Sequence, residues 1–371
     1  MENRSPLELI EKLYQQSVWP EIRETVRRGW SARPLVVELD PTSQCDLACP
    51  ECINADVLGN GAFSPARLLE IAHELVVMGV HAVILIGGGE PLLHPAISEV
   101  LGILHNGGVR IGITTNGTQL HRHMPAIADY ASWTRVSLDC ASAEAYAWVR
   151  PSHSGANVFP SVIDNIRQLA AGKTGSLGYS YMLITRTLPN GRLLHNFGEV
   201  LAAARLAREL GCDYFEIKPC RDARHFVLPI PREFIGMLTE QIAAAQALVT
   251  ADFQVVTGSG TDVALGNGSP VERKPYARCW AVELRTLITP HGCYLCPYHR
   301  GDPARQYGEA HHTPLAQLWE SAHRRQVCTA TQPDTACRFN CVRHATNIAL
   351  AALAKTDRPN PPLLPDYDAF I

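Results

Sequence analysis

The stretch from residue 35 to residue 64, "LVVELDPTSQCDLACPECINADVLGNGAFS", decides how the rest of the chain is interpreted. It opens with a mostly apolar run, 35–39, that predicts a buried strand. Three cysteines follow within eight residues, at Cys45, Cys49 and Cys52, and no fourth cysteine lies nearby. The first question is therefore what three thiols at the end of a strand bind.

The composition narrows the classes of partner. The chain has 371 residues, of which 46% are hydrophobic and 19% charged, as in ordinary globular proteins. Its net charge of −3 gives no electrostatic reason to expect a nucleic acid or a membrane surface as partner. No apolar run approaches the roughly 18 residues of a membrane span, and the start, "MENRSPLELIEKLYQQ", lacks the apolar core of a signal peptide. We expect a cytoplasmic protein with no nucleic-acid or membrane partner.

The twelve cysteines are clustered rather than spread along the chain. Three lie at 45–52 and six lie between 279 and 341, whereas Cys140, Cys212 and Cys220 are scattered. Disulfides are rare in the cytosol, so clustered thiols indicate metal binding or catalysis.

Short apolar runs alternate with amphipathic segments from residue 35 to about residue 257. Strands are expected at 35–39, 82–86, 110–114, 135–138, 179–184 and 214–218, with 253–256 as an extension of the series. Helices are expected at 64–78, 97–104, 158–171 and 191–210. The first of these helices has Ser64 as N-cap, Pro65 at its first position and Gly79 just past its end. Such alternation predicts a parallel sheet with right-handed crossovers, either doubly wound or curved into a partial barrel.

The composition changes near residue 258, where a loop-rich and cysteine-rich segment begins. We therefore expect three parts: a helical lead-in at 1–34, the strand-and-helix region at 35–257, and a cysteine-rich part at 258–371.

Chemistry-bearing residues follow the predicted strands. "GGGEP" (87–91) follows the second strand, "TNG" (115–117) the third, "SLDC" (137–140) spans the end of the fourth, and "KPC" (218–220) that of the sixth. Because ligands of parallel α/β folds bind at the carboxyl ends of the strands, these residues predict one site. Three thiolates suit an iron–sulfur cluster with one iron lacking a protein ligand, whereas structural zinc sites complete a set of four ligands.

The Cys45-x3-Cys49-x2-Cys52 spacing, the "GGGEP" turn and the "TNG" turn together resemble the radical S-adenosylmethionine (SAM) superfamily over about residues 33–257. The resemblance implies a partial (βα)6 barrel and a 4Fe–4S cluster whose free iron chelates the amino and carboxylate groups of SAM. It also implies an external one-electron donor such as flavodoxin or ferredoxin. Reductive cleavage of SAM then gives a 5′-deoxyadenosyl radical, which abstracts hydrogen from a substrate.

The resemblance assigns roles to individual residues. Cys45, Cys49 and Cys52 correspond to the cluster ligands. Gly88, Gly89 and Glu90 would contact the amino end of SAM. Other polar parts of SAM would be contacted by Asn116, Ser137 and Arg150. Alternative interpretations are a partial zinc site or buried thiols for the cysteines, an ordinary tight turn for "GGGEP", and structural roles for Ser137 and Arg150.

The later cysteines are Cys279, Cys293, Cys296, Cys328, Cys337 and Cys341. Two short strands around the turn 290–292 predict a hairpin that brings Cys279 close to Cys296, and "CRFNCVRH" supplies a further pair at a helix start. The region resembles the SPASM and twitch auxiliary-cluster domains of radical SAM enzymes, although the Cys-x2-Cys-x5-Cys-x3-Cys run of a full SPASM domain is absent. We expect a small α+β domain with one auxiliary 4Fe–4S cluster on Cys279, Cys296, Cys337 and Cys341. The alternatives are Cys293 in place of Cys296, two auxiliary clusters, or a zinc site that uses His344.

A fully ligated auxiliary cluster can accept an electron, which suits oxidation. Twitch-bearing relatives that oxidise a carbinol carbon act in aminoglycoside and aminocyclitol biosynthesis. The first expectation is therefore dehydrogenation of a small polar alcohol in antibiotic biosynthesis, with a sugar, an aminocyclitol or a nucleoside as substrate.

Three other functions stay open. One is epimerisation with a thiol hydrogen donor, for which the candidates are Cys140, Cys220, Cys293 and Cys328. Modification of a ribosomal peptide is less favoured, because the 34 residues before the barrel are few for a leader-binding module. A non-enzymatic iron–sulfur sensor would explain the cysteines but not "GGGEP".

Candidates for proton transfer or for contacts with substrate hydroxyl groups are Lys218, Glu216, Asp139 and Tyr181. Glu216 and Lys218 share a strand face, which also suits a structural ion pair between them.

Overall fold

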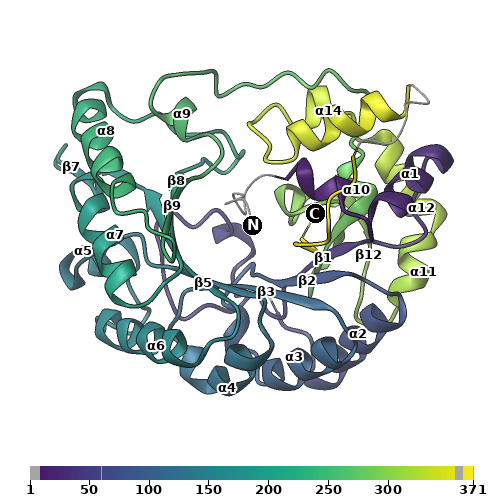
Figure 1. Cartoon of the computed structure of the whole chain (residues 1–371), viewed down its shortest axis with the longest axis horizontal. Coiled ribbons are helices and arrows are strands. Elements are labelled where there is room, and N and C mark those ends of the chain that lie inside the picture. The colour runs from purple at the N-terminus through teal and green to yellow at the C-terminus, as the bar shows by residue number, and fades with distance from the viewer. Residues whose placement is uncertain (1–8, 60, 356–361, 371) are drawn as a thin grey trace. The chain divides into compact units, whose positions relative to one another are not determined.

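The computed structural model describes residues 9–59, 61–355 and 362–370 (Figure 1). The chain divides into two compact units. The first unit comprises 1–43, 59–112 and 272–371, and the second comprises 44–58 and 113–271. The three-part division expected from the sequence rests on composition and resemblance, and it stays a prediction.

The first unit is organised around strand β1 (Val36–Leu39). Its strands lie in the order β12 (Gln306–Gly308), β11 (Gly292–Tyr294), β10 (Arg285–Thr289), β1 and β2 (Ala82–Leu85). β1 pairs in parallel with both β10 and β2, whereas β10, β11 and β12 pair antiparallel. The predicted hairpin around 290–292 is thus confirmed, and β1, flanked on both edges, is wholly buried as its apolar sequence requires.

The helices α2 (Pro65–Val77) and α3 (Ile97–Asn106) lie side by side in this unit, as Figure 1 shows. The Ser64 hydroxyl accepts the Arg67 N–H at 3.2 Å, and Gly79 ends the α2 region in the left-handed conformation. The local signals of the sequence therefore predict α2 correctly. Its buried face consists of Leu68, Ile71, Ala72 and Leu75.

The remaining helices of the first unit are short. They are η1 (Glu11–Tyr14), α1 (Trp19–Arg28), η3 (Pro91–Leu93), α10 (Ala281–Leu284), η5 (Pro297–His299), η6 (Pro303–Arg305), α11 (Leu315–Glu320), α12 (Ala322–Ala330), α13 (Pro333–Ala336) and α14 (His344–Leu353). Of the residues expected as a helical lead-in, the described part contains η1 and α1, and residues 1–8 lie outside the described residues.

The second unit contains the parallel strands β4 (Trp133–Ser137), β5 (Ser176–Leu183), β8 (Tyr214–Pro219) and β9 (Gln254–Thr257), in that order. β3 (Arg110–Thr115) runs across the boundary between the units along the chain. The other elements are η2 (Ala55–Val57), α4 (Leu120–Tyr130), α5 (Ala143–Val149), α6 (Phe159–Gly172), β6 (Thr185–Thr187), β7 (Leu193–His195), η4 (Phe197–Glu199), α7 (Val200–Glu209), α8 (Arg232–Gln246) and α9 (Thr261–Ala264). Figure 1 shows α7 and α8 along one face of β5, β8 and β9. All expected strands are present, which confirms the α/β class.

One expected helix is wrong in its first half. The segment 191–199 forms β7 and η4, and α7 begins only at Val200. β7 pairs antiparallel with β6, and the Asn196 side chain bonds to the backbone of Asp139 (2.8 Å), Met182 (2.7 Å) and Ile184 (2.9 Å). These tertiary hydrogen bonds override the helical pattern of the sequence.

Within the described residues, no helix is both long and apolar enough to span a lipid bilayer.

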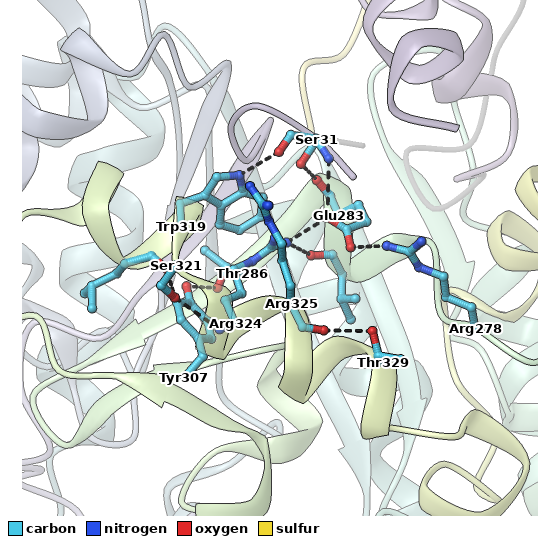
Figure 2. Close-up of polar contacts among 12 residues, drawn as sticks. Ser31, Arg278, Glu283, Thr286, Tyr307, Trp319, Ser321, Arg324, Arg325 and Thr329 are labelled. Carbon is cyan, nitrogen blue, oxygen red and sulfur yellow. Dashed lines mark hydrogen bonds and ion pairs between the residues drawn. The ribbon is translucent and has the colours of Figure 1, made fainter. Parts of the chain in front are cut away.

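A buried ion-pair network joins distant segments of the first unit (Figure 2). The carboxylate of Glu283, only 1% exposed, binds Arg278 and lies 3.0 Å from the Arg324 guanidinium. Arg324 also donates to the Val282 carbonyl at 2.8 Å and stacks on Trp319. Because both charged groups are buried, each one depends on the other for compensation.

We predict that Glu283→Gln lowers the free energy of unfolding by about 3 kcal/mol, because it leaves Arg324 buried without its counter-charge. Anaerobic chemical denaturation measures this change. Arg27→Gln breaks an exposed helix pair with Glu24 and serves as the control, with a midpoint close to that of the wild type. Equal midpoints for both variants would show that the network is not stabilising.

Candidate functional site

The first cysteine loop belongs to the second unit and is firmly anchored. Cys45, Cys49 and Cys52 are partly exposed free thiols, and the Cys52 N–H donates to the Cys49 carbonyl at 3.1 Å. Between them, Leu47 is buried and the Ala48 N–H donates to the Pro151 carbonyl at 2.7 Å. The loop therefore presents its thiols from a fixed backbone.

Asp46 fastens the loop to the end of β3. Its carboxylate accepts hydrogen bonds from the side chains of Asn116 (2.8 Å), Thr118 (2.6 Å) and Gln119 (2.9 Å). The Asn116 amide nitrogen also lies 3.9 Å from the Cys45 sulfur. Asn116 was predicted to contact SAM, and the structure places its amide against the cysteine loop. Sequence reasoning missed Asp46, whose position between two cysteines was its only signal.

Arg150 lies between the carboxylate of Asp139 and the thiol of Cys49. Asp139 is the second residue after β4, and its backbone φ of 61° is rare for a residue other than glycine. Its carboxylate accepts the Met182 N–H (2.6 Å) and the Arg150 Nε–H (2.9 Å). The Arg150 Nη1 atom lies 3.9 Å from the Cys49 sulfur. Burial raises the pKa of the Cys49 thiol while Arg150 opposes this rise, so Arg150 favours the thiolate that a metal requires.

A second ion pair holds the far side of the loop. Glu51, between Cys49 and Cys52, forms a bidentate pair with Arg186 of β6 at 2.7 and 2.6 Å. The Arg186 guanidinium also lies 5.4 Å from the centre of the Trp148 ring. Such planar, two-bond pairs fix orientation as well as charge.

The loop that begins with Gly87 belongs to the first unit. A Cβ atom on Gly87 would lie 1.9 Å from the Gly89 carbonyl oxygen, so only glycine fits there. The Gly88 N–H donates to the Asp40 carboxylate at 2.9 Å, and Glu90 accepts the Leu92 N–H at 3.1 Å. Gly88, Gly89 and Glu90 thus form a tight, internally bonded turn; their contact with SAM stays a prediction.

The end of β8 carries a lysine with no hydrogen bond to any described residue. The sequence left open an ion pair between Glu216 and Lys218, and in the structure Glu216 pairs with Arg135 at 3.1 Å. Burial lowers the pKa of Lys218, and the charge of Arg135 lowers it further. A lysine in this setting has a larger fraction of neutral amine than an exposed one, which suits a proton acceptor.

Two of the four candidate hydrogen-donor thiols, Cys140 and Cys220, lie in the second unit. Cys140 is completely buried after β4, and burial together with Asp139 raises its pKa well above the ordinary value. Burial and the charge of Glu51 raise the pKa of Cys220 to about 11, and this thiol is 6% exposed. Both stay protonated at neutral pH, as a hydrogen-atom donor must.

Two further candidates lie on neighbouring strands of the second unit. Ser137 is the half-buried last residue of β4 and stands opposite Ser180. Tyr181 is fully buried and donates its hydroxyl to the Asn196 carbonyl at 2.5 Å, which favours a structural role.

The C-terminal cysteines form a second group in the first unit. Burial raises the pKa of Cys296 well above its usual value, and the nearby thiols of Cys337, Cys279 and Cys341 raise it further. Burial and Cys341 raise the pKa of Cys279 to about 11, and burial with Cys279 and Cys341 raises that of Cys337 to about 12. Thiols affect one another in this way only when they lie close together.

Each sulfur of this group faces a backbone N–H group or a ring nitrogen. Cys279 faces the backbone N–H groups of residues 281 and 282, and Cys296 faces that of residue 298. Cys337 lies 3.5 Å from the His299 Nε2 atom, and Cys341 accepts the Arg343 N–H at 3.4 Å. N–H donors to sulfur stabilise thiolate ligands and tune iron–sulfur clusters, so the four residues fit such a cluster.

The two remaining cysteines of this region lie in other surroundings. Cys293 is buried in β11, where burial raises its pKa to about 12 and its neighbour is Tyr307. Cys328 is buried in α12 beside Arg324. His344 lies 3.1 Å from the Tyr276 hydroxyl and 3.6 Å from Glu272.

The distances between these side chains can be compared with those that a single bound metal ion requires. Within the described residues, no three His, Cys, Asp or Glu side chains converge closely enough to hold a single metal ion. A zinc ion needs its ligands about 2 Å from one point. The thiolates of a multinuclear cluster bind different iron atoms, so this finding concerns only a single metal ion.

Comparison with known proteins places this geometry in context. Residues 39–185 match the family model of the radical SAM superfamily. Over 283 residues the chain is 28% identical to mycofactocin maturase MftC of Mycobacterium ulcerans (strain Agy99), which covers 75% of this chain and 72% of the relative. A shorter alignment of 191 residues, 29% identical, relates it to the GTP 3',8-cyclase of Synechococcus sp. (strain CC9902) and covers 49% of this chain and 54% of the relative.

Solved structures share the fold. Streptococcus suis SuiB bound to precursor peptide SuiA matches with a TM-score of 0.61 and 15% identity, over 85% of this chain and 71% of that chain. The enzyme anSMEcpe with bound AdoMet and Cp18Cys peptide matches with a TM-score of 0.56 and 14% identity, over 87% and 99%. The segment 39–185, which contains the three-cysteine loop, therefore matches the radical SAM superfamily, and the similarity to MftC extends over three quarters of the chain.

Proposed function

We propose that this chain is a radical SAM enzyme that abstracts hydrogen from a peptide substrate and carries one auxiliary iron–sulfur cluster. The observation that carries the proposal is the anchored three-cysteine loop, in which Arg150 lies beside Cys49 and Asp46 fixes the backbone. Cys45, Cys49 and Cys52 would hold the SAM-binding cluster. SAM itself would contact the turn of Gly88, Gly89 and Glu90 and the side chains of Asn116, Ser137 and Arg150.

Cys279, Cys296, Cys337 and Cys341 would hold the auxiliary 4Fe–4S cluster. Their mutual effects on pKa and the donors that face each sulfur support this set. Cys293 is a weaker alternative to Cys296 because it lies beside Tyr307 in β11. With four protein ligands, such a cluster has no position for a substrate.

When bound, SAM and the two clusters supply the 5′-deoxyadenosyl radical and take up the remaining electron. The chain itself would supply proton transfer. Lys218, whose pKa is lowered by burial and by Arg135, would accept the proton that the substrate loses during oxidation. If hydrogen is returned instead, as in epimerisation, Cys220 is the better donor because Cys140 is completely enclosed.

The substrate class rests on the relatives. SuiB and anSMEcpe share this fold and have been solved with peptides, and the maturase MftC covers three quarters of the chain. These likenesses support a peptide substrate better than the small alcohol that was expected first from the sequence. A small polar substrate remains the second candidate, since the GTP 3',8-cyclase of Synechococcus also resembles this chain. The external one-electron donor, such as flavodoxin or ferredoxin, stays a prediction.

The cluster assignment predicts the iron content. Anaerobically reconstituted protein should contain about eight irons per chain from two 4Fe–4S clusters. Replacing Cys45, Cys49 and Cys52 together by Ala should remove about half of this iron and abolish cleavage of SAM. Replacing Cys337 and Cys341 together should remove the other half.

The matched control is Cys212→Ala, because Cys212 is buried beside Asp213 and Lys173 and belongs to neither group. This variant should retain the full iron content. Unchanged iron in either ligand variant would contradict the assignment of that group.

Lys218→Met should reduce product formation about 100-fold while 5′-deoxyadenosine is still released, because proton acceptors contribute on the order of 10² or more. The neutral amine is the active form, so the wild-type rate should rise with pH through the lowered pKa of Lys218. Lys218→Met should lose this rising limb, and Lys218→Arg, which stays charged, should not restore it. Lys173→Met removes a lysine paired with Asp213 and is the control. A pH profile unchanged in Lys218→Met would exclude Lys218 as the acceptor.

Deuterium distinguishes the possible reactions. Reduced enzyme and SAM are incubated in deuterated water with synthetic peptides, with amino sugars and cyclitols, or with GTP, and the products are analysed by mass spectrometry. We expect a peptide product lighter by two hydrogens. A product of unchanged composition with one carbon-bound deuterium would indicate hydrogen return, and Cys220→Ala should then abolish it. Turnover of the small molecules alone would contradict the peptide proposal.

A further inference from the structure

A buried carboxylate connects the turn after β2 with the C-terminal part of the first unit. Asp40 is 1% exposed and lies directly after β1. Its Oδ2 atom accepts the Gly88 N–H at 2.9 Å and the Arg300 Nε–H at 2.7 Å, and its Oδ1 atom accepts the Arg300 Nη2–H at 3.0 Å. One carboxylate thus fixes both the glycine turn and a residue 260 positions further along the chain.

The partner of Asp40 comes from the same short turn that serves the second cysteine group. Cys296 is the N-cap of η5, His299 is its last residue, and Arg300 follows at once. The His299 Nε2 atom lies 3.5 Å from the Cys337 sulfur. Movement of this turn on gain or loss of its cluster would therefore reach Arg300 directly.

The geometry leaves Asp40 little freedom. The Asp40 N–H donates to the Ile288 carbonyl of β10 at 2.8 Å, and β2 is held to β1 by the bond from Ile86 N–H to the Leu39 carbonyl at 3.0 Å. A two-bond Arg–carboxylate pair is directional. Its loss in a buried place leaves an uncompensated charge, which the neighbouring backbone must move to solvate.

We propose that Asp40 and Arg300 position the Gly88 turn for SAM and make its affinity for SAM depend on the C-terminal four-cysteine site. The proposal rests on the proposed function, since it concerns the same SAM site. Asp40 and Arg300 are positioning residues and do not themselves touch the reacting atoms. Because coupling between two sites is reciprocal, SAM should also stabilise the four-cysteine site.

The first test measures the dissociation constant of SAM by anaerobic equilibrium dialysis on reconstituted protein. Arg300→Met should weaken SAM binding about 10-fold, as loss of an outer supporting contact typically does, and Arg300→Lys should restore part of it. The control is Arg33→Met, which breaks a partly buried pair with Glu21 in the same unit. Hydrogen exchange of a peptide that contains 87–91 should be faster in Arg300→Met and unchanged in Arg33→Met.

The second test asks whether the coupling runs through this pair. The combined variant Cys337→Ala and Cys341→Ala should also bind SAM more weakly. Adding Arg300→Met to it should then produce no further loss, because residues of one network are not additive. Additive losses would overturn the proposed route.

The outcomes separate the two levels of the proposal. If the wild-type protein binds no SAM, the proposed function fails. If the wild-type protein binds SAM, and both Arg300→Met and Arg300→Lys bind SAM as tightly as the wild type does, the positioning role of Asp40 and Arg300 is overturned. The proposed function then still stands. A loss that Arg33→Met shares would reveal a general effect of removing an arginine from the first unit and would also overturn the positioning role.

Discussion

The structure depends on how buried thiols are compensated. A thiol that binds iron must lose its proton, and burial alone opposes that loss. The second unit brings Arg150 to Cys49, and the first unit gives a donor to each of Cys279, Cys296, Cys337 and Cys341. The buried Cys212 and Cys293 also have polar neighbours, Lys173 and Tyr307, so the assigned ligands differ from them in lying in groups.

Two buried or partly buried aspartates, Asp46 and Asp40, also fix the backbone of the loops that they contact. Asp46 is held by three side chains that follow β3, and Asp40 is held by Arg300 and the Gly88 N–H. Two aspartates on either side of the same segment therefore fix the cysteine loop in one unit and the glycine turn in the other. Radical chemistry needs such rigidity, because a small displacement of reacting groups costs a large factor in rate.

Local signals in the sequence predicted the fold well, and contacts between distant residues were out of reach. Ser64, Pro65 and Gly79 mark α2 by their own chemistry, and the apolar runs mark the strands. The expected helix at 191–199 failed because β6 and the Asn196 side chain hold that segment by tertiary bonds. The cysteine motif could be recognised from the sequence because its three cysteines lie within eight residues. The Asp40–Arg300 pair could not be predicted, because the two residues lie 260 positions apart and no local sequence pattern connects them. Asn116 was identified as functional, but only the structure shows its bond to Asp46.

The most direct test of two distinct clusters is the electron paramagnetic resonance spectrum of the reduced protein with and without SAM. One cluster should have an iron open to SAM and the other should have four protein ligands. We therefore predict two overlapping signals, of which SAM changes one and leaves the other unaltered. If SAM changed neither signal, the three-cysteine loop would not hold an open cluster, and the central claim would be contradicted.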